Sequence, residues 1–310
     1  MNRLRAANTS AAFAFALLVL CAYSWSSYAM SAGMVVVQPQ VRPPYDRVYQ
    51  EIIMGFNRTY TTPPQTVLML NPENAEKIGA EISRINPDLI MALGSRSASI
   101  ARQYNANTPK LAGAVSQVPE GMHGITMWPD PQLVLERLII VYGKPKTIYL
   151  VTDIDKRQSQ ITGIKDFAQI SGFKASVHHA DNIKDAAARY QQVLGQLQPG
   201  DAIWLMRDKA LNDPSLLSLV LETAWKNKVA VISSNPVHVK RGALMAIFPN
   251  NQAMGESLGR LATRVEQDGA DLAPIVEPLT DVHTSLNNRT SRHLGITLSS
   301  EANELIDSVF

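Results

Sequence analysis

The sequence predicts an α/β fold in which two doubly wound parallel-sheet lobes are joined by a hinge. Short runs of continuous apolar residues, typical of strands buried on both faces of a parallel sheet, alternate with stretches of helical periodicity. The order of these elements in the first half of the chain recurs in the second half. At 310 residues, the chain is long enough for two domains with separate cores.

The overall composition is that of a globular protein, with 45% hydrophobic and 18% charged residues. The formal net charge is only +2, so no strong positive field favours binding to DNA or RNA. We therefore expect no nucleic-acid partner.

The chain begins with the pattern of a cleaved export signal. Arg3 and Arg5 give a positive start, an apolar run spans residues 11–22, and small residues occupy both ends of the tripeptide 27–29. We expect residues 1–29 to be a signal peptide that is removed when the protein reaches the periplasm.

The two alternatives to a cleaved signal are a membrane anchor and a lipoprotein. A membrane anchor would need to cross about 30 Å of hydrocarbon, for which the apolar run is short. A lipoprotein would attach its lipid at Cys21, but Leu20 stands where a small residue is usual. Cys21 is the only cysteine, so its removal would leave no thiol, disulfide or cysteine-based metal site.

In the first half of the mature chain, three apolar runs predict buried strands at residues 34–37, 66–70 and 89–93. Between the second and third runs, Asn71 followed by Pro72 has the pattern of a helix start, with a capping side chain before a proline. One apolar helix face follows, made of Ala75, Ile78, Ile82 and Ile85.

The second half repeats this pattern, with apolar runs at residues 147–151, 202–205 and 229–232. Asp130 before Pro131, and Asp213 before Pro214, are the predicted helix starts. The apolar face of a further helix is made of Ile183, Ala187, Tyr190, Leu194 and Leu197.

Residues 86–115 and 198–234 share one order: a turn, a buried strand, a polar loop, a helix and another strand. We interpret this as two similar lobes facing each other across a cleft; chance recurrence of βαβ order is the alternative. Residues 124–127 and 246–249 have the pattern of extended segments that cross between lobes. The predicted domains are residues 34–126 plus 251–278 for lobe 1, and 127–250 plus 279–310 for lobe 2, with the C-terminal tail on lobe 2 or on the hinge.

Several segments resemble the substrate-binding proteins of ABC transporters, of the type that includes bacterial tryptophan and tyrosine binders. They are residues 87–95 (PDLIMALGS), 200–208 (GDAIWLMRD), 228–236 (KVAVISSNP), 239–244 (VKRGAL) and the tail 288–310. The resemblance implies a periplasmic-binding-protein fold of type I, a small-molecule ligand, no cofactor and a membrane permease as partner. A monomer is expected.

Three positions depart from that family's pattern. Residues 115–119 lack the usual Asp-Pro pair, Lys209 replaces the asparagine of a Pro-Asp-Asn loop, and Ser299 replaces a proline. The first of these loops faces the ligand in such folds, so the resemblance does not specify the ligand.

Ligands of open α/β sheets bind beyond the carboxyl ends of the strands. Ser95, Arg96 and Ser97 lie there, at the start of a predicted helix. Helix N–H groups, two hydroxyls and a guanidinium suit a carboxylate or phosphate; an ordinary N-cap beside a solvated arginine is the alternative. The sequence has neither a dinucleotide glycine pattern nor a Walker motif there, so nucleotide binding is not expected.

In the second half, Asp208 follows a buried strand between Arg207 and Lys209. Its carboxylate could hold a ligand ammonium group, and the resemblance places this position in the cleft; a surface salt bridge is the alternative. Three further candidates, which end neighbouring strands and offer hydrogen bonds, are Thr152, Ser234 and Asn235.

Two aromatic residues are also candidates. Trp128 follows the first predicted crossing strand, where its indole could stack on a flat or apolar ligand, and Tyr45 follows the first strand and could face it. Packing against the hinge is the alternative for both.

Catalytic motifs are missing from the sequence. His178 and His179 are adjacent, and neighbours on a strand point to opposite faces, so they cannot share a metal ion. Neither His-Glu-x-x-His nor Gly-x-Ser-x-Gly is present. We expect no catalytic residue and no metal, and hence not an enzyme.

The sequence thus favours the solute-binding protein of an ABC importer, which captures a small amino-acid-like ligand by hinge closure. The ligand carboxylate is assigned to Ser95–Ser97 and its ammonium to Asp208. One alternative is a periplasmic sensing partner of a membrane receptor. Another is a binder of a small organic anion held by a basic cluster made of Arg96, Arg207 and Lys209.

Overall fold

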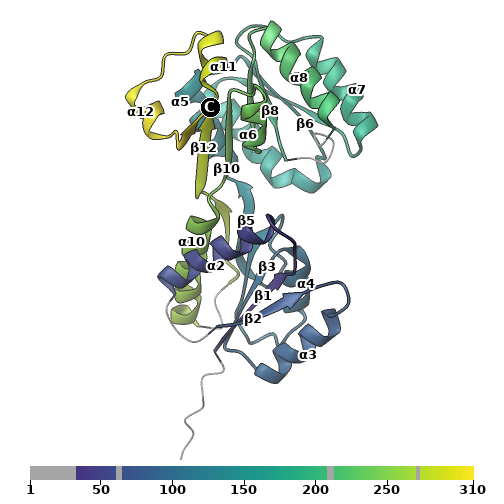
Figure 1. Ribbon diagram of the computed structural model, residues 1–310, viewed down its shortest axis with the longest axis vertical. Helices are drawn as coiled ribbons and strands as arrows, with labels where there is room; N and C mark the ends of the chain where they lie inside the picture. Colours follow the sequence, from purple (N-terminus) through teal and green to yellow (C-terminus); the bar gives the residue numbers. More distant parts are fainter. Residues whose placement is uncertain (1–32, 61–64, 208–212, 270–272) are drawn as a thin grey trace, which may run out of the picture.

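The computed structural model describes residues 33–60, 65–207, 213–269 and 273–310. Two α/β lobes lie one above the other along the long axis of the molecule, joined by a narrow waist of strands (Figure 1). The predicted fold class is confirmed. The export segment 1–29, Asp208 and Lys209 lie outside the described residues. In the described ranges, the helices are too short or too polar for any of them to pass through a membrane.

The lobe 1 sheet has six strands in the order β11-β5-β4-β3-β1-β2, and every neighbouring pair is parallel. These strands are β1 (Met34–Pro39), β2 (Gln65–Leu70), β3 (Leu89–Leu93), β4 (Lys110–Val115), β5 (His123–Pro129) and β11 (Val276–Leu279). The helices are α2 (Asp46–Thr59), α3 (Ala75–Ile85), α4 (Ser95–Arg102) and α10 (Asn251–Asp268).

Strand β1 shows why this segment folds as it does. Successive side chains of a strand point to opposite faces, so its continuous apolar run supplies two cores at once. Met34 and Val36 join the core under α2 and α10, whereas Val35 and Val37 join the core under α3 and α4.

The lobe 2 sheet has seven strands in the order β13-β12-β10-β9-β8-β6-β7. They are β6 (Thr147–Thr152), β7 (Lys174–His179), β8 (Ala202–Leu205), β9 (Ala230–Ser233), β10 (Met245–Pro249), β12 (Val282–Leu286) and β13 (Ser308–Val309). The helices are α5 (Pro131–Tyr142), η1 (Asp155–Arg157), α6 (Gln158–Ser171), α7 (Ile183–Leu194), α8 (Pro214–Lys226), α9 (Val237–Lys240), α11 (Asn288–His293) and α12 (Ser300–Glu304). Its two cores lie under α5 and α6 on one face and under α7 and α8 on the other.

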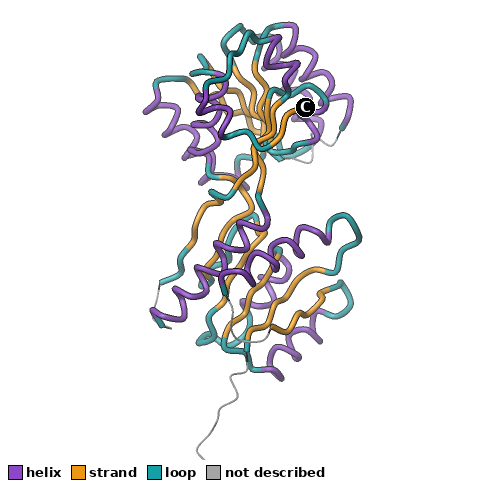
Figure 2. Tube along the Cα trace, turned by 60° about the vertical axis from the view of Figure 1, so that its left-hand side comes forward, coloured by secondary structure: helices purple, strands orange, loops and turns teal. Residues whose placement is uncertain are grey.

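The chain passes between the sheets in three places: from β5 to α5, from β10 to α10, and from β11 to β12. Figure 2 shows these extended segments side by side in the waist. Strand β12 enters lobe 2 from lobe 1 and runs antiparallel to β10, and β13 at the end of the chain pairs with β12. The residue-level lobe bounds stay a prediction.

Two of the three predicted helix starts have the expected cap. The Asp130 carboxylate accepts a hydrogen bond from Gln132 N, and the Asp213 carboxylate accepts from Ser215 N. The third prediction is wrong. The Asn71 side chain accepts from Glu73 N and Asn74 N, so it closes a turn, and α3 begins only at Ala75.

Helices α2 and α10, which cover one face of the lobe 1 sheet, cross at very close range although they are remote in the sequence. A Cβ atom placed on Gly255 of α10 would lie 2.0 Å from Ile52 O of α2, and one on Gly55 would lie 1.9 Å from Gln252 O. Glycine is therefore required at this crossing, because any side chain would push the backbones apart.

We expect Gly255→Ala to lower the free energy of unfolding by about 1–3 kcal/mol, the usual cost of overpacking a close contact. Urea-induced unfolding measures this loss. The matched control is Gly79→Ala in α3, where an added Cβ meets no atom within 4 Å. Alanine has the higher helix propensity, so the control should gain about 0.5–1 kcal/mol. Equal stability of the two variants would show that α2 and α10 can separate freely.

Candidate functional site

The carboxyl ends of the parallel strands in both sheets point toward the junction of the lobes. A hollow of about 470 Å³ lies there, within the size range of small-molecule sites. We call it the cleft hollow. Its lining from lobe 1 includes Tyr45, Val48, Ala114, Asn251 and Met254; its lining from the crossing strands is Met127, Phe248 and Pro249. Its lining from lobe 2 includes Met206, Arg207, Ser234, Asn235 and His238.

The lobe 2 wall is made by the loops that follow β8 and β9. These strands are parallel neighbours, so the residues after them emerge side by side. Ser234 N donates to Leu205 O at 3.0 Å, which ties the end of β9 to the end of β8. Arg207 lies two residues after the end of β8, is exposed, and lines the hollow.

The turn after β9 is held rigid by side-chain hydrogen bonds. Asn235 N donates to Ser233 Oγ at 3.0 Å, and Asn235 Oδ1 accepts from Val237 N at 3.0 Å. Ser233 Oγ also lies 2.8 Å from His238 Nδ1, and Ser234 Oγ accepts from Trp204 Nε1 at 3.3 Å. The polar groups of this wall are therefore pre-positioned.

The cleft hollow carries a single positive charge among the described residues that line it, the Arg207 guanidinium. Within those ranges of the chain, Arg207 takes part in no ion pair. The charge of Arg207 also acts on a residue of lobe 1, Tyr49 on α2. Burial raises the pKa of the Tyr49 hydroxyl, and the positive charge of Arg207 partly opposes that rise. The hollow therefore presents a cation with the geometry to bind a carboxylate.

Lobe 1 contributes a residue with an unusual backbone. Ala114, at the end of β4, has φ of 53°, in the left-handed region that favours glycine, and the register between β4 and β5 shifts beside it. Such conformations cost about 1–2 kcal/mol and concentrate at functional sites. Ala114 lines the cleft hollow, in agreement with that pattern.

A second hollow of about 550 Å³, on residues that include Trp128, lies beside the crossing strand β5. The Trp128 Nε1–H donates to Ser116 O of lobe 1 at 3.0 Å. The Arg157 guanidinium of lobe 2 lies 4.0 Å from the centre of the indole ring, and Arg157 Nη2 donates to Arg207 O at 2.6 Å. Through Trp128 and Arg157, Ser116 of lobe 1 is thus linked to the backbone of Arg207 in lobe 2.

The structure brings three of the predicted site residues together in the cleft hollow: Tyr45, Ser234 and Asn235. Trp128 lies in the second hollow, and Thr152 is buried, with 1% of its surface exposed, away from both hollows.

The predicted anion site of lobe 1 lines neither hollow. Ser95 and Arg96 are exposed at the start of α4, where Arg96 Nη2 donates to Pro72 O at 3.3 Å. Ser97 is fully buried, and its Oγ has no hydrogen-bond partner within the described part of the chain.

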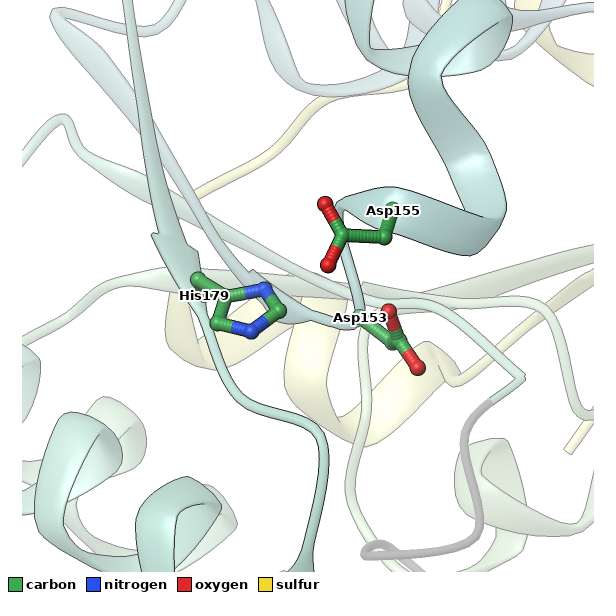
Figure 3. A group of neighbouring side chains, drawn as sticks. All are labelled: Asp153, Asp155 and His179. Atoms are coloured by element: carbon green, nitrogen blue, oxygen red, sulfur yellow. The ribbon is translucent and has the colours of Figure 1, made fainter.

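One group of side chains has the composition of a metal site. Ligand atoms of Asp153, Asp155 and His179 lie within 4.8 Å of one another, at the carboxyl ends of β6 and β7 (Figure 3). The Asp153 carboxylate is already paired with Lys156, which lowers its pKa, and His179 Nδ1 accepts from Ile154 N at 3.3 Å. Asp153 and His179, two of the three possible metal ligands, are thus already bound to other groups of the protein. His178 instead contacts Ser176.

No family model matches the chain, and no curated protein matches it, but solved structures match most of it. The ligand-free, open structure of a substrate-binding protein with adhesive properties from Clostridium difficile has a TM-score of 0.67 at 21% identity. The match covers 89% of this chain and 99% of that one. An ABC domain in complex with L-Trp from Streptococcus pneumonia has a TM-score of 0.60 at 16% identity, over 89% and 99% of the two chains.

This chain has the fold of the ABC-type substrate-binding proteins. The same fold occurs in a LacI transcriptional regulator from Lactobacillus brevis, with a TM-score of 0.52 at 14% identity over 79% of this chain and 98% of that one.

Within the substrate-binding fold, several lining residues were missed by sequence reasoning. Met127 and Phe248 lie on the crossing strands, and Asn251 and Met254 begin α10. The predicted crossings at residues 124–127 and 246–249 were the available signal, because side chains on crossing strands must border the junction of the lobes.

The pKa of His238, in the wall of the cleft hollow, is lowered by burial and, to a smaller extent, by the positive charge of Arg241. In the unfolded chain, His238 therefore takes up a proton near the ordinary pKa of 6.5, whereas in the folded protein it takes up that proton only at a lower pH. The stability that neutral His238 contributes is fully present above pH 6.5 and is lost as the pH falls below 6.5. His123 and His178 have lowered pKa values too and act with the same sign.

We expect the loss of unfolding free energy between about pH 7.5 and about pH 5.5 to be smaller in His238→Gln than in the natural protein. Glutamine keeps a polar side chain toward Ser233 but cannot take up the proton. Urea unfolding at the two pH values measures the difference. An equal loss in both proteins would assign the pH dependence to the other histidines.

Proposed function

We propose that this protein is an extracytoplasmic solute-binding protein of an ABC importer, which captures a small amino-acid-like ligand between its lobes. The observation that carries the proposal is the cleft hollow, which receives side chains from lobe 1, from lobe 2 and from the crossing strands. A molecule in that position contacts both lobes at once.

Closure of the lobes then follows from differential affinity. A ligand that gains contacts to lobe 1 only when the lobes approach binds the closed state more tightly and shifts the population toward it. The crossing strands, which carry Met127 and Phe248 beside the ligand, are the hinge. A permease can then distinguish loaded protein from empty protein by the lobe arrangement.

The ligand chemistry is proposed from two residues that line the hollow and from Asp208, which lies outside the described residues. Arg207 binds the carboxylate, and the Asn235 amide adds a hydrogen bond. Asp208, the next residue in the chain, holds the ammonium group. The helix start at Ser95–Ser97 lines neither hollow and Ser97 is fully buried, so the carboxylate is assigned to Arg207 in its place.

The experiment is a thermal-shift screen of the mature protein against the L-amino acids, followed by two analogues of the best ligand. One analogue lacks the carboxylate and the other lacks the ammonium group. An amino-acid site predicts that the midpoint rises with the intact ligand and with neither analogue, because each analogue leaves one buried charge unpaired. Absence of a shift with every amino acid would contradict the proposed ligand class.

A small organic anion is the second candidate, favoured by the single positive charge of Arg207 in the described lining of the hollow. In that case, the analogue without the ammonium group should stabilise the protein as well as the amino acid does, or better.

We also propose that residues 1–29 direct export to the periplasm and are then removed. The expected N-terminus of the mature protein is Met30. Intact-mass analysis of the exported protein measures this directly. A lipid attached to Cys21 would instead show that the protein stays anchored to a membrane.

A further inference from the structure

A third hollow lies at the end of lobe 2 that faces away from the cleft. Its volume is about 590 Å³, also within the range of small-molecule sites. We call it the distal hollow. It lies between the end of α8, the turn after α9, the start of α11 and Phe310 (Figure 1 labels α8 and α11).

The topology of lobe 2 explains why these segments meet so far from the cleft. Helix α8 begins after β8, on the cleft side, and runs back to end at Lys226, just before β9 begins. Arg241 precedes the start of β10, and Asn287 follows β12, which is antiparallel to β10, so both lie at that same edge of the sheet. The distal hollow and the cleft hollow are therefore at opposite edges of one sheet.

The floor of the distal hollow is apolar and rigid. Leu221 is buried, and the Phe310 ring is half-exposed. The Trp225 indole stacks on the His293 imidazole, with ring centres 3.7 Å apart and planes 5° apart, and His293 Nε2 lies 2.9 Å from Trp225 O. A flat or apolar group that entered the hollow would meet a preformed aromatic surface.

Its rim is strongly positive. Four exposed cations, on three different segments, line it together with one acidic side chain, Glu222. They are Lys226, Lys240, Arg241 and Arg289. In the described ranges of the chain, none of the four takes part in an ion pair.

The cations are also held over the aromatic floor. Lys240 Nζ lies 4.8 Å from the centre of the Phe310 ring, and the Arg289 guanidinium carbon lies 5.3 Å from that of Trp225. Glu222 offsets only one of the four positive charges around the hollow, and a bound anion would relieve the repulsion that remains.

From this arrangement we propose that the distal hollow is a second ligand site, specific for a soluble organic anion with an apolar or aromatic body. The body would lie on Trp225 and Phe310, and the carboxylate, sulfonate or phosphate head would lie among the cations of the rim. The site stands independently of the proposed transport function, because it shares no lining residue with the cleft hollow.

Two fluorescent probes that differ only in charge test the site. 8-Anilinonaphthalene-1-sulfonate is an aromatic anion, and N-phenyl-1-naphthylamine is the same body without the sulfonate. The test protein is the double variant Lys226→Gln, Lys240→Gln. Its charge-matched control is Lys77→Gln, Lys184→Gln, which removes two exposed lysines elsewhere.

We expect the test variant to bind the sulfonate about tenfold more weakly, because two exposed charge contacts are lost, and the control to bind it as the natural protein does. The neutral probe should bind all three proteins equally. Raising the ionic strength from about 0.01 M to about 0.15 M shortens the screening length from about 30 Å to about 8 Å. This change should weaken binding of the sulfonate probe and leave binding of the neutral probe unchanged. Both variants change exposed side chains, and circular dichroism verifies their folding.

Three results would overturn the proposal. Equal sulfonate affinity of the test and control variants would show that the rim does not hold the anion. Loss of sulfonate binding in Arg207→Gln, with none in the test variant, would place the probe in the cleft hollow. Binding to vesicles of phosphatidylglycerol, without binding of the free sulfonate, would identify a membrane-contacting surface instead.

Discussion

Replacing Arg207 by glutamine should weaken binding of the cleft ligand by about 100-fold, the usual effect of removing one partner of a desolvated charge pair. Arg207 is the one positive charge among the described residues that line the cleft hollow, which also include the pre-positioned Asn235. Glutamine still donates hydrogen bonds, but it leaves the carboxylate uncompensated when closure excludes water. Titration calorimetry with the amino acid found by thermal shift measures the loss.

The matched control is Arg96→Gln. Both arginines are exposed and both follow the end of a parallel strand, but Arg96 lines neither hollow and donates to Pro72 O. If Arg207 holds the carboxylate, the control keeps its affinity. A loss in Arg96→Gln, with Arg207→Gln unaffected, would show that the carboxylate binds at the start of α4, as the sequence predicts.

Trp128 suggests how occupancy of the cleft could reach the hinge. Arg157 contacts the Trp128 ring and also donates to the carbonyl of Arg207, the residue assigned to the ligand. A shift of the loop after β8 would therefore move Arg157 relative to a residue on a crossing strand. We propose that this chain of contacts couples a ligand in the cleft hollow to the hinge.

The fold could be predicted wherever a strand is buried on both faces. Strands β1 and β3 read as continuous apolar runs because helices cover both sides of their sheet. Strand β7, Lys174–His179, has no such run, because it lies at the edge of its sheet and its residues are only partly buried. Edge position depends on the strand order, which local sequence does not encode.

The site could be predicted only in part, for a related reason. Ser234 and Asn235 could be placed because they follow a recognisable buried strand. By contrast, Phe248 and Met254 line the hollow because of where the chain crosses between lobes, and Ser95 lies outside it although it also follows a strand. A strand end marks the correct edge of a sheet, but the position along that edge is set by the tertiary arrangement.

Asp208 is the residue that we propose distinguishes an amino-acid ligand from a simple anion. We expect Asp208→Asn to weaken binding of the amino acid by about 100-fold, since the ligand ammonium would lose its countercharge on closure. For an anionic ligand, the same change removes the negative charge that follows Arg207 in the sequence and should leave affinity unchanged or improve it. Asp166→Asn, an exposed aspartate on α6, is the control for the loss of one carboxylate.

The decisive measurement is a cycle of two proteins and two ligands. Calorimetry gives the affinity of the natural protein and of Asp208→Asn, each for the amino acid and for its analogue without the ammonium group. If Asp208 holds the ammonium, the substitution costs affinity for the amino acid and little for the analogue, so the two changes are not additive. Equal losses for the two ligands would mean that Asp208 makes no contact with the ammonium group and acts only through Arg207, by keeping that cation in place. An unchanged or higher affinity in Asp208→Asn would instead identify a site for organic anions, with Arg207 as the group that selects them.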